Sequence, residues 1–158
     1  MQLINKQLIE KVVDQAKDSP RKRMNYNFHT TYDATLQRML NVMEPDTYIQ
    51  PHKHEDPDKA EVFLVLKGRV LVVEFDDQGE ILSSCVLSFS EGLYGAEISP
   101  RVWHCILPLE PETVIYEVKD GPYSPLTDKN FASWAPKEGT PGCKAYRDDL
   151  LKRLNIQL

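Results

Sequence analysis

The chain has 158 residues, and its 24 acidic side chains outnumber its 19 lysines and arginines, which gives a formal net charge of −5. This length fits a single domain with a substantial core, and the acidic balance argues against a general binder of nucleic acids or membrane surfaces. No stretch approaches the roughly 18 apolar residues of a membrane span, and the N-terminus lacks the pattern of a signal peptide. We therefore expect a cytoplasmic protein with no nucleic-acid or membrane partner.

Three cysteines agree with a reducing compartment. Cys85, Cys105 and Cys143 are odd in number and have no Cys-x-x-Cys spacing. Disulfide frameworks use paired cysteines and zinc sites use closely spaced ones, so we expect three reduced thiols. If residues 102–108 form a strand, Cys105 faces away from its neighbour His104.

Residues 3–18 predict an amphipathic helix that ends before Pro20. Its apolar stripe consists of Leu8, Ile9, Val12, Val13 and Ala16. Because one face is apolar, we expect this helix to pack on the rest of the domain or on a second subunit.

A polar segment follows, with a basic cluster at residues 21–23. If this segment is extended, Arg23, Asn25, Asn27 and His29 share one face. One interpretation is an exposed basic loop that leads into an edge strand. The other is a polar wall for a ligand, because arginine suits anions and asparagine suits hydroxyl groups. We predict ligand contacts for the arginine and both asparagines, and treat the histidine as a surface or structural residue.

Residues 35–43 predict a strand in which Arg38 lies among apolar neighbours, either on a solvated face or in a polar cavity. Tyr48 and Gln50 share the parity of the two histidines that follow them. An extended chain would place them on one cavity wall. We therefore predict Arg38, Tyr48 and Gln50 as further contacts to a substrate.

His52 and His54 form a His-x-His pair that an extended chain projects to one side, with backbone positions about 6–7 Å apart. The pair alone is equally well explained by two surface histidines. Glu61 follows at the start of a β-rich segment, and His104 lies about fifty residues further on. Three imidazoles and a carboxylate suit iron, zinc, manganese, nickel or copper, and the sequence does not choose among them.

The middle of the chain alternates strand-forming runs with turns. Strands are predicted at 61–67, 69–76, 80–88, 102–108 and 112–119, and a strand or loop at 92–99. Such short strands indicate an all-β barrel or sandwich. Within the last of them, Glu117 is either a cavity acid or the partner of an ion pair with Lys119 or another strand.

The tail is rich in proline and glycine and carries Tyr123, Phe131 and Trp134. We expect these aromatics to fix a long loop across the barrel or at a subunit contact, where it could also cover a cavity mouth. Residues 143–158 predict a short helix with an apolar side.

The motif spacing resembles that of the cupin family. The first cupin motif is His-x-His, a glutamate, six residues and a glycine, matched by His52, His54, Glu61 and Gly68. The second motif has a proline before the third histidine, as Pro100 precedes His104. The chain departs from the family in a longer spacer before Glu61, and in lacking the usual glycine and asparagine of the second motif.

The chain is more closely similar to the WbuC family of cupin-fold metalloproteins. The matching segments include SPRKRMNYNFH, VMEPDTYIQPHKH, PDKAEVFLVLKGRV and WHCILPLEPETVIYEVKDGPY. The resemblance implies one cupin domain over residues 1–158: an N-terminal helix at 1–20, a double-stranded β-helix barrel at 24–120, and a loop and short C-terminal helix at 121–158. It also implies an association with bacterial surface-polysaccharide gene clusters, without a settled reaction.

These observations lead to a functional hypothesis with open alternatives. We expect one divalent transition metal (Fe, Zn, Mn or Ni) on His52, His54, Glu61 and His104, and a small-molecule ligand such as a sugar or anionic metabolite. The lead hypothesis is an isomerase, epimerase or oxygenase acting on a sugar or nucleotide-sugar. The alternatives are a non-catalytic binding module with a structural metal and an iron-dependent dioxygenase. By analogy with cupins, we expect a homodimer.

Overall fold

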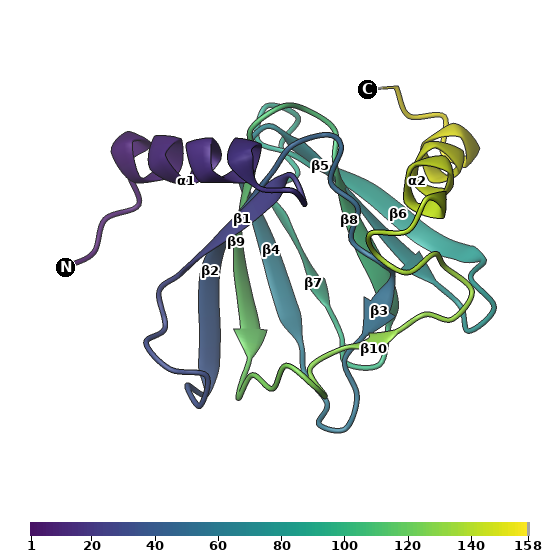
Figure 1. The fold of residues 1–158 in the computed structure, drawn as a ribbon, viewed down its shortest axis with the longest axis horizontal. Coiled ribbons are helices and arrows are strands. Elements are labelled where there is room, and N and C mark those ends of the chain that lie inside the picture. The colour runs from purple at the N-terminus through teal and green to yellow at the C-terminus, as the bar shows by residue number, and fades with distance from the viewer. Residues whose placement is uncertain (158) are drawn as a thin grey trace.

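The computed structural model describes residues 1–157 as two facing antiparallel sheets with a helix near each end of the chain (Figure 1). The elements are α1 (Lys6–Asp18), β1 (Arg23–Asn27), β2 (Leu36–Met43), β3 (His52–Lys53), β4 (Glu61–Lys67), β5 (Arg69–Phe75), β6 (Ile81–Ser88), β7 (Gly95–Ile98), β8 (Trp103–Pro108), β9 (Thr113–Asp120), β10 (Asn130–Phe131) and α2 (Gly142–Arg153). The predicted mainly-β fold is confirmed.

The strands form two five-stranded sheets, with the order β1-β2-β9-β4-β7 in sheet A and β10-β3-β8-β5-β6 in sheet B. The predicted strand at 61–67 has the observed bounds, and the others agree to within a few residues. The prediction missed β3 and β10 as strands, because two residues are too few to show an alternating pattern.

Along each strand, alternate side chains point inward and fill the space between the two sheets. Apolar side chains of both sheets, such as Phe63, Val72 and Ile115, form the inner core. Along β9, however, the inward positions after Ile115 are Glu117 and Lys119, and both are buried. The interior therefore changes from apolar to polar along β9, and this change positions the site described below.

Helix α1 packs on the outer face of sheet A. Val12, Val13 and Ala16 contact the outward side chains of Leu40 and other residues of β2 and β9. The predicted helix is confirmed and covers the barrel, although it begins at Lys6 rather than at residue 3. No helix within residues 1–157 is long and apolar enough to cross a membrane.

The tail crosses sheet B and ends in α2, which packs on its outer face. Leu150 and Leu151 of α2 lie in one cluster with Cys105, which faces away from the barrel interior as predicted. Trp134 fixes the tail, since its ring centroid lies 5.1 Å from that of Phe75. Phe131 is more than half exposed and does not anchor the loop. The predicted C-terminal helix ends at Arg153, and residue 158 lies outside the described part.

Two glycines test how strongly Trp134 holds the tail. Gly79 (φ +87°) and Gly92 (φ +81°) share a backbone conformation that side chains rarely adopt, but a Cβ would lie 2.7 Å from the Trp134 ring at Gly79 and within 4 Å of nothing at Gly92. We expect Gly92→Ala to cost about 1 kcal/mol of unfolding free energy through backbone strain, and Gly79→Ala about 1–3 kcal/mol more through the clash. Urea unfolding measures both, and equal losses would contradict the proposed role of Trp134.

Candidate metal centre

Three histidines converge from two neighbouring strands of sheet B. His52 of β3 lies directly opposite His104 of β8, and their ring centroids are 4.5 Å apart. His54 follows β3, and its ring centroid lies 5.2 Å from that of His52. The two residues of the His-x-His pair therefore lie on one side, next to the third histidine.

The carboxylate comes from the opposite sheet. Glu61 is the first residue of β4, and the long spacer at 55–60 carries the chain from sheet B to sheet A. Its Oε1 lies 3.3 Å from Nε2 of His54 and also contacts Nε2 of His104. One potential ligand atom from each of the four residues lies within 4.8 Å of the others, and all four side chains are at most 4% exposed.

Backbone carbonyls orient all three imidazole rings. Nδ1 of His52 lies 3.0 Å from the carbonyl oxygen of Gln50, and Nδ1 of His104 lies 2.9 Å from that of Val102. Nδ1 of His54 pairs with the carbonyl oxygen of Asp128. A carbonyl only accepts, so each Nδ1 carries the proton and each Nε2 presents a lone pair.

The acceptor atoms of the cluster face one another, and no hydrogen-bond donor of the described residues lies between them. Within residues 1–157, Nε2 of His54, Nε2 of His104 and Oε1 of Glu61 are buried and have no hydrogen-bond partner. Buried polar atoms are normally satisfied, and clustered acceptors are best satisfied by a cation. The residues therefore fit a metal ion.

The electrostatics favour a neutral His52 and an ionised Glu61. Burial, assisted by the charge of Lys129, holds the pKa of His52 well below its usual range. Burial alone would raise the pKa of Glu61, but His104 and His54 outweigh it and hold this pKa well below its usual range. Three imidazole nitrogens and one carboxylate oxygen could hold zinc, iron, manganese or nickel.

A buried ion network supports His54 from behind. The carboxylate of Asp128 lies 2.6 Å from Nζ of Lys59 and 2.5 Å from Nζ of Lys119, and these side chains are at most 4% exposed. Burial would raise the pKa of Asp128, but the two lysines outweigh it and lower this pKa. The network fixes the residue whose carbonyl orients His54. Sequence reasoning missed it because its three members come from distant segments.

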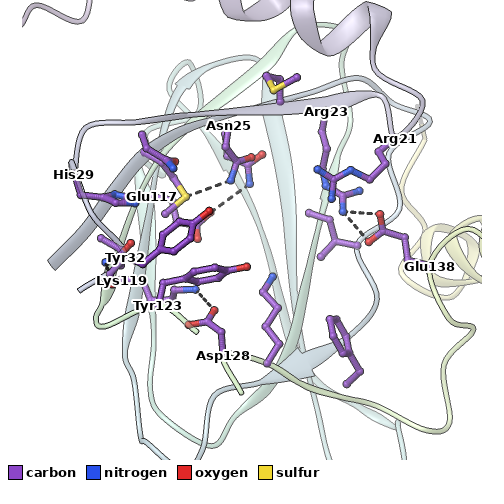
Figure 2. Close-up of a pocket in the computed structure, with 18 residues that line it drawn as sticks. Arg21, Arg23, Asn25, His29, Tyr32, Glu117, Lys119, Tyr123, Asp128 and Glu138 are labelled. Carbon is purple, nitrogen blue, oxygen red and sulfur yellow. Dashed lines mark hydrogen bonds and ion pairs between the residues drawn. The ribbon is translucent and has the colours of Figure 1, made fainter. Parts of the chain in front are cut away.

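A polar cavity of about 420 Å³ adjoins the four-residue cluster. Its walls come from the inner faces of β1, β2 and β9 and from the tail between residues 123 and 138 (Figure 2). The four cluster residues do not line it, but Asp128 and Phe131 do. The ring centroid of Phe131 lies 6.1 Å from that of His52, so the cavity and cluster share neighbours.

Three of the six predicted ligand-contacting residues line this cavity. Arg23, Asn25 and Asn27 alternate along β1 toward it, and His29 follows them. In Figure 2 the guanidinium of Arg23 meets Glu138, with 2.7 Å from Nη2 to each carboxylate oxygen. Glu117 also lines the cavity, which favours the cavity-acid interpretation, since Lys119 pairs with Asp128 instead.

The other three predicted residues, Arg38, Tyr48 and Gln50, do not line this cavity. Arg38 has the parity of the β2 residues that face α1, and its Nη2 donates to the carbonyl of Phe28. Tyr48 donates to the carbonyl of Pro136, and Gln50 donates to that of Ala132. Tyr48 and Gln50 do not share a wall with His52 and His54, because residues 48–51 do not form a regular strand and alternate side chains need not point the same way. They hold the tail to the barrel.

The buried network makes a prediction with a matched control. Asp128→Asn leaves two buried lysines without a carboxylate, so we expect a loss of about 3–5 kcal/mol in unfolding free energy. Asp58→Asn breaks the ion pair between Asp58 and Arg101, whose side chains are 48% and 58% exposed, respectively. Because this pair is exposed, we expect a loss of less than about 1 kcal/mol in unfolding free energy. Urea unfolding of both variants checks this, and similar losses would show that burial of the network contributes little.

Three comparisons place the chain among known proteins. The model of a family described as "Domain of unknown function (DUF6016)" matches residues 4–87, which is more than half of the chain. No curated protein matches.

Solved structures match the fold at low sequence identity. KdgF from Halomonas sp. has a TM-score of 0.50 at 19% identity, covering 68% of this chain and 84% of its own. The capsular polysaccharide assembling protein CapF from Staphylococcus aureus has a TM-score of 0.57 at 22% identity over 72% of this chain, which spans only 32% of CapF. L-ribose isomerase from Acinetobacter sp. DL28 has a TM-score of 0.54 at 13% identity, and the match covers 79% of this chain and 73% of the isomerase chain.

These matches confirm the cupin-type barrel, while the WbuC assignment stays a prediction. Since the family model spans more than half of its length, the chain belongs to the family described as Domain of unknown function (DUF6016).

Proposed function

We propose that this chain is a metal-dependent cupin enzyme that acts on a sugar or nucleotide-sugar in the polar cavity. His52, His54, Glu61 and His104 would hold one divalent transition metal. One observation carries the proposal: the rings are oriented by backbone carbonyls so that buried acceptors face each other with no donor between them. A bound cation would satisfy all of these acceptors at once.

When bound, the metal would polarise a carbonyl or hydroxyl group or lower the pKa of a bound water. The chain's own residues supply the remaining functions. The amides of Asn25 and Asn27 can both donate to and accept from substrate hydroxyl groups. Burial, then the charge of Glu61, raises the pKa of Glu117, so its carboxyl group is suited to hold or accept a proton in the cavity.

A sugar substrate is supported by the names of similar structures and by the family resemblance. One similar protein assembles a capsular polysaccharide, and another is an isomerase solved in complex with L-ribose. The resemblance to the WbuC family, which we propose as the finer assignment, also implies surface-polysaccharide biosynthesis. Isomerisation or epimerisation moves a proton, which a carboxyl group beside a metal can do.

A non-catalytic module with a structural metal is the second candidate. It is favoured by the near-complete burial of the four potential ligands and by their absence from the cavity wall. An iron-dependent dioxygenase is the third, since histidine and carboxylate ligands suit iron. Its requirement for iron and oxygen consumption separates it from the other two.

We further propose that residues 1–158 form one cytoplasmic domain that pairs as a homodimer. The free state of all three cysteines is compatible with the cytoplasm. Exposed apolar side chains gather near the edge strand β7, at Leu64, Leu66, Phe89, Leu93 and Tyr94. We call these five residues the edge patch. A second copy that covered them would remove apolar surface from water.

Metal content is the first test. We expect the wild-type protein, purified without a metal-affinity column, to carry about one metal ion per chain by plasma mass spectrometry. His52→Ala and His104→Ala should lose it, because each removes one ligand nitrogen. His29→Ala is the matched control, since this histidine lines the cavity outside the cluster and should leave metal content unchanged. A folded wild-type protein that is metal-free and cannot be reloaded would refute the proposal.

The homodimer has its own test. Multi-angle light scattering should give twice the chain mass for the wild type and the chain mass for Phe89→Lys, which places a charge in the edge patch. Leu126→Lys alters an even more exposed apolar residue outside the patch and should remain dimeric. A monomeric wild type, or a dimeric Phe89→Lys, would argue against pairing through this edge.

A further inference from the structure

The charges on the cavity wall do not cancel. The lining includes four cationic side chains (Arg21, Arg23, Lys119 and Lys129) and three acidic ones (Glu117, Asp128 and Glu138). Glu138 is bound to Arg23, while Asp128 is bound to Lys119 and to Lys59 behind it. Arg21 is exposed to solvent, which screens its charge. Lys129 is the remaining cation and Glu117 the remaining acid, and the raised pKa of Glu117 favours its neutral form.

Lys129 has neither a hydrogen bond nor an ion pair with any side chain of residues 1–157. Burial, then the charge of Lys119, lowers the pKa of Lys129 against the opposite effect of the nearby acids. Lys129 is half-buried at the cavity wall, where its ammonium group is less well hydrated than in open solvent, and a bound anion would pair with it.

The position of Lys129 puts this charge at the end of the cavity next to the four-residue cluster. The preceding residue, Asp128, orients His54 through its carbonyl. Two residues further on, Phe131 lies directly opposite His52 across the β3–β10 pair. An anion on Lys129 would therefore lie beside the potential metal ligands.

The opposite wall presents unused amide groups. Asn41 is only 6% exposed, and its Oδ1 has no hydrogen-bond partner within residues 1–157, while its Nδ2 lies 3.3 Å from Glu117. The Nδ2 of Asn25 lies 3.3 Å from the sulfur of Met39, which is a weak acceptor. Hydroxyl groups both donate and accept, so they match these amides.

We propose that the cavity binds an anionic, polyhydroxylated molecule of monosaccharide size, with its carboxylate or phosphate group on Lys129 and its hydroxyl groups on Asn25 and Asn41. A cavity of about 420 Å³ has the size of a small-ligand pocket. Arg23 is not the anchor, because Glu138 and the carbonyl of Tyr48 already occupy its guanidinium. The inference rests on the proposed function only in identifying this molecule as a substrate, since binding itself needs no metal.

Three sugars that differ at one carbon test the anion site. Calorimetric titration of metal-free wild-type protein with glucose, glucuronate and glucose 6-phosphate should show at least about tenfold tighter binding of a charged sugar than of glucose, as a charge-assisted hydrogen bond predicts. Whichever of glucuronate and glucose 6-phosphate binds more tightly shows whether the site prefers a carboxylate or a phosphate group. Lys129→Met should remove the preference and leave glucose binding unchanged. Lys11→Met, the same charge change on the exposed face of α1, should keep the preference.

The results that would overturn the anion site differ from those that would overturn the metal site. Equal binding of the three sugars, no binding of either charged sugar, or a preference retained in Lys129→Met would overturn the inference. If Lys129→Met does not fold, Lys129→Gln replaces it, because it keeps a polar side chain while removing the charge. Metal content is measured on the same samples: a protein that binds metal but not anions refutes only this inference. One that binds anions but never metal refutes only the metalloenzyme.

Discussion

The backbone carbonyls of Gln50, Val102 and Asp128 determine what the buried cluster can do. By accepting from Nδ1, they leave Nε2 of each imidazole as an acceptor directed at a carboxylate that also accepts. If the rings were reversed, the same four residues could form an ordinary hydrogen-bonded group. The arrangement instead favours a cation, and most of the surrounding structure maintains it.

The tail is part of the site rather than an appendage. Its residue Asp128 orients His54 and is itself held by two buried lysines from the barrel. The same segment supplies Phe131, opposite His52, and completes the cavity wall. Detachment of the tail would therefore open the cavity and release one of the three rings, so the stability of the tail and the integrity of the candidate metal site are coupled.

Local patterns predicted the parts of this site that depend on strand periodicity. His52 and His54 lie on one side, and the β1 residues share one face, because alternate residues of an extended chain point the same way. The same rule failed for Tyr48 and Gln50, where the chain is irregular. The ion network and Lys129 could not be predicted, since their proximity to the cluster arises from how the tail folds back across sheet B, and no local pattern encodes that.

The cost of the cluster bears on whether a metal would be structural or functional. Three orphaned buried acceptors at about 1–3 kcal/mol each would consume a large share of a typical stability of about 5–15 kcal/mol. Apolar side chains such as those of the neighbouring inner core could fill the same space at no such cost. A metal that served only stability would therefore first have to offset a penalty created by its own ligands. The polar cavity and the half-buried Lys129 on its wall adjoin these ligands, and a bound anion, but not a structural metal alone, would pair with that lysine.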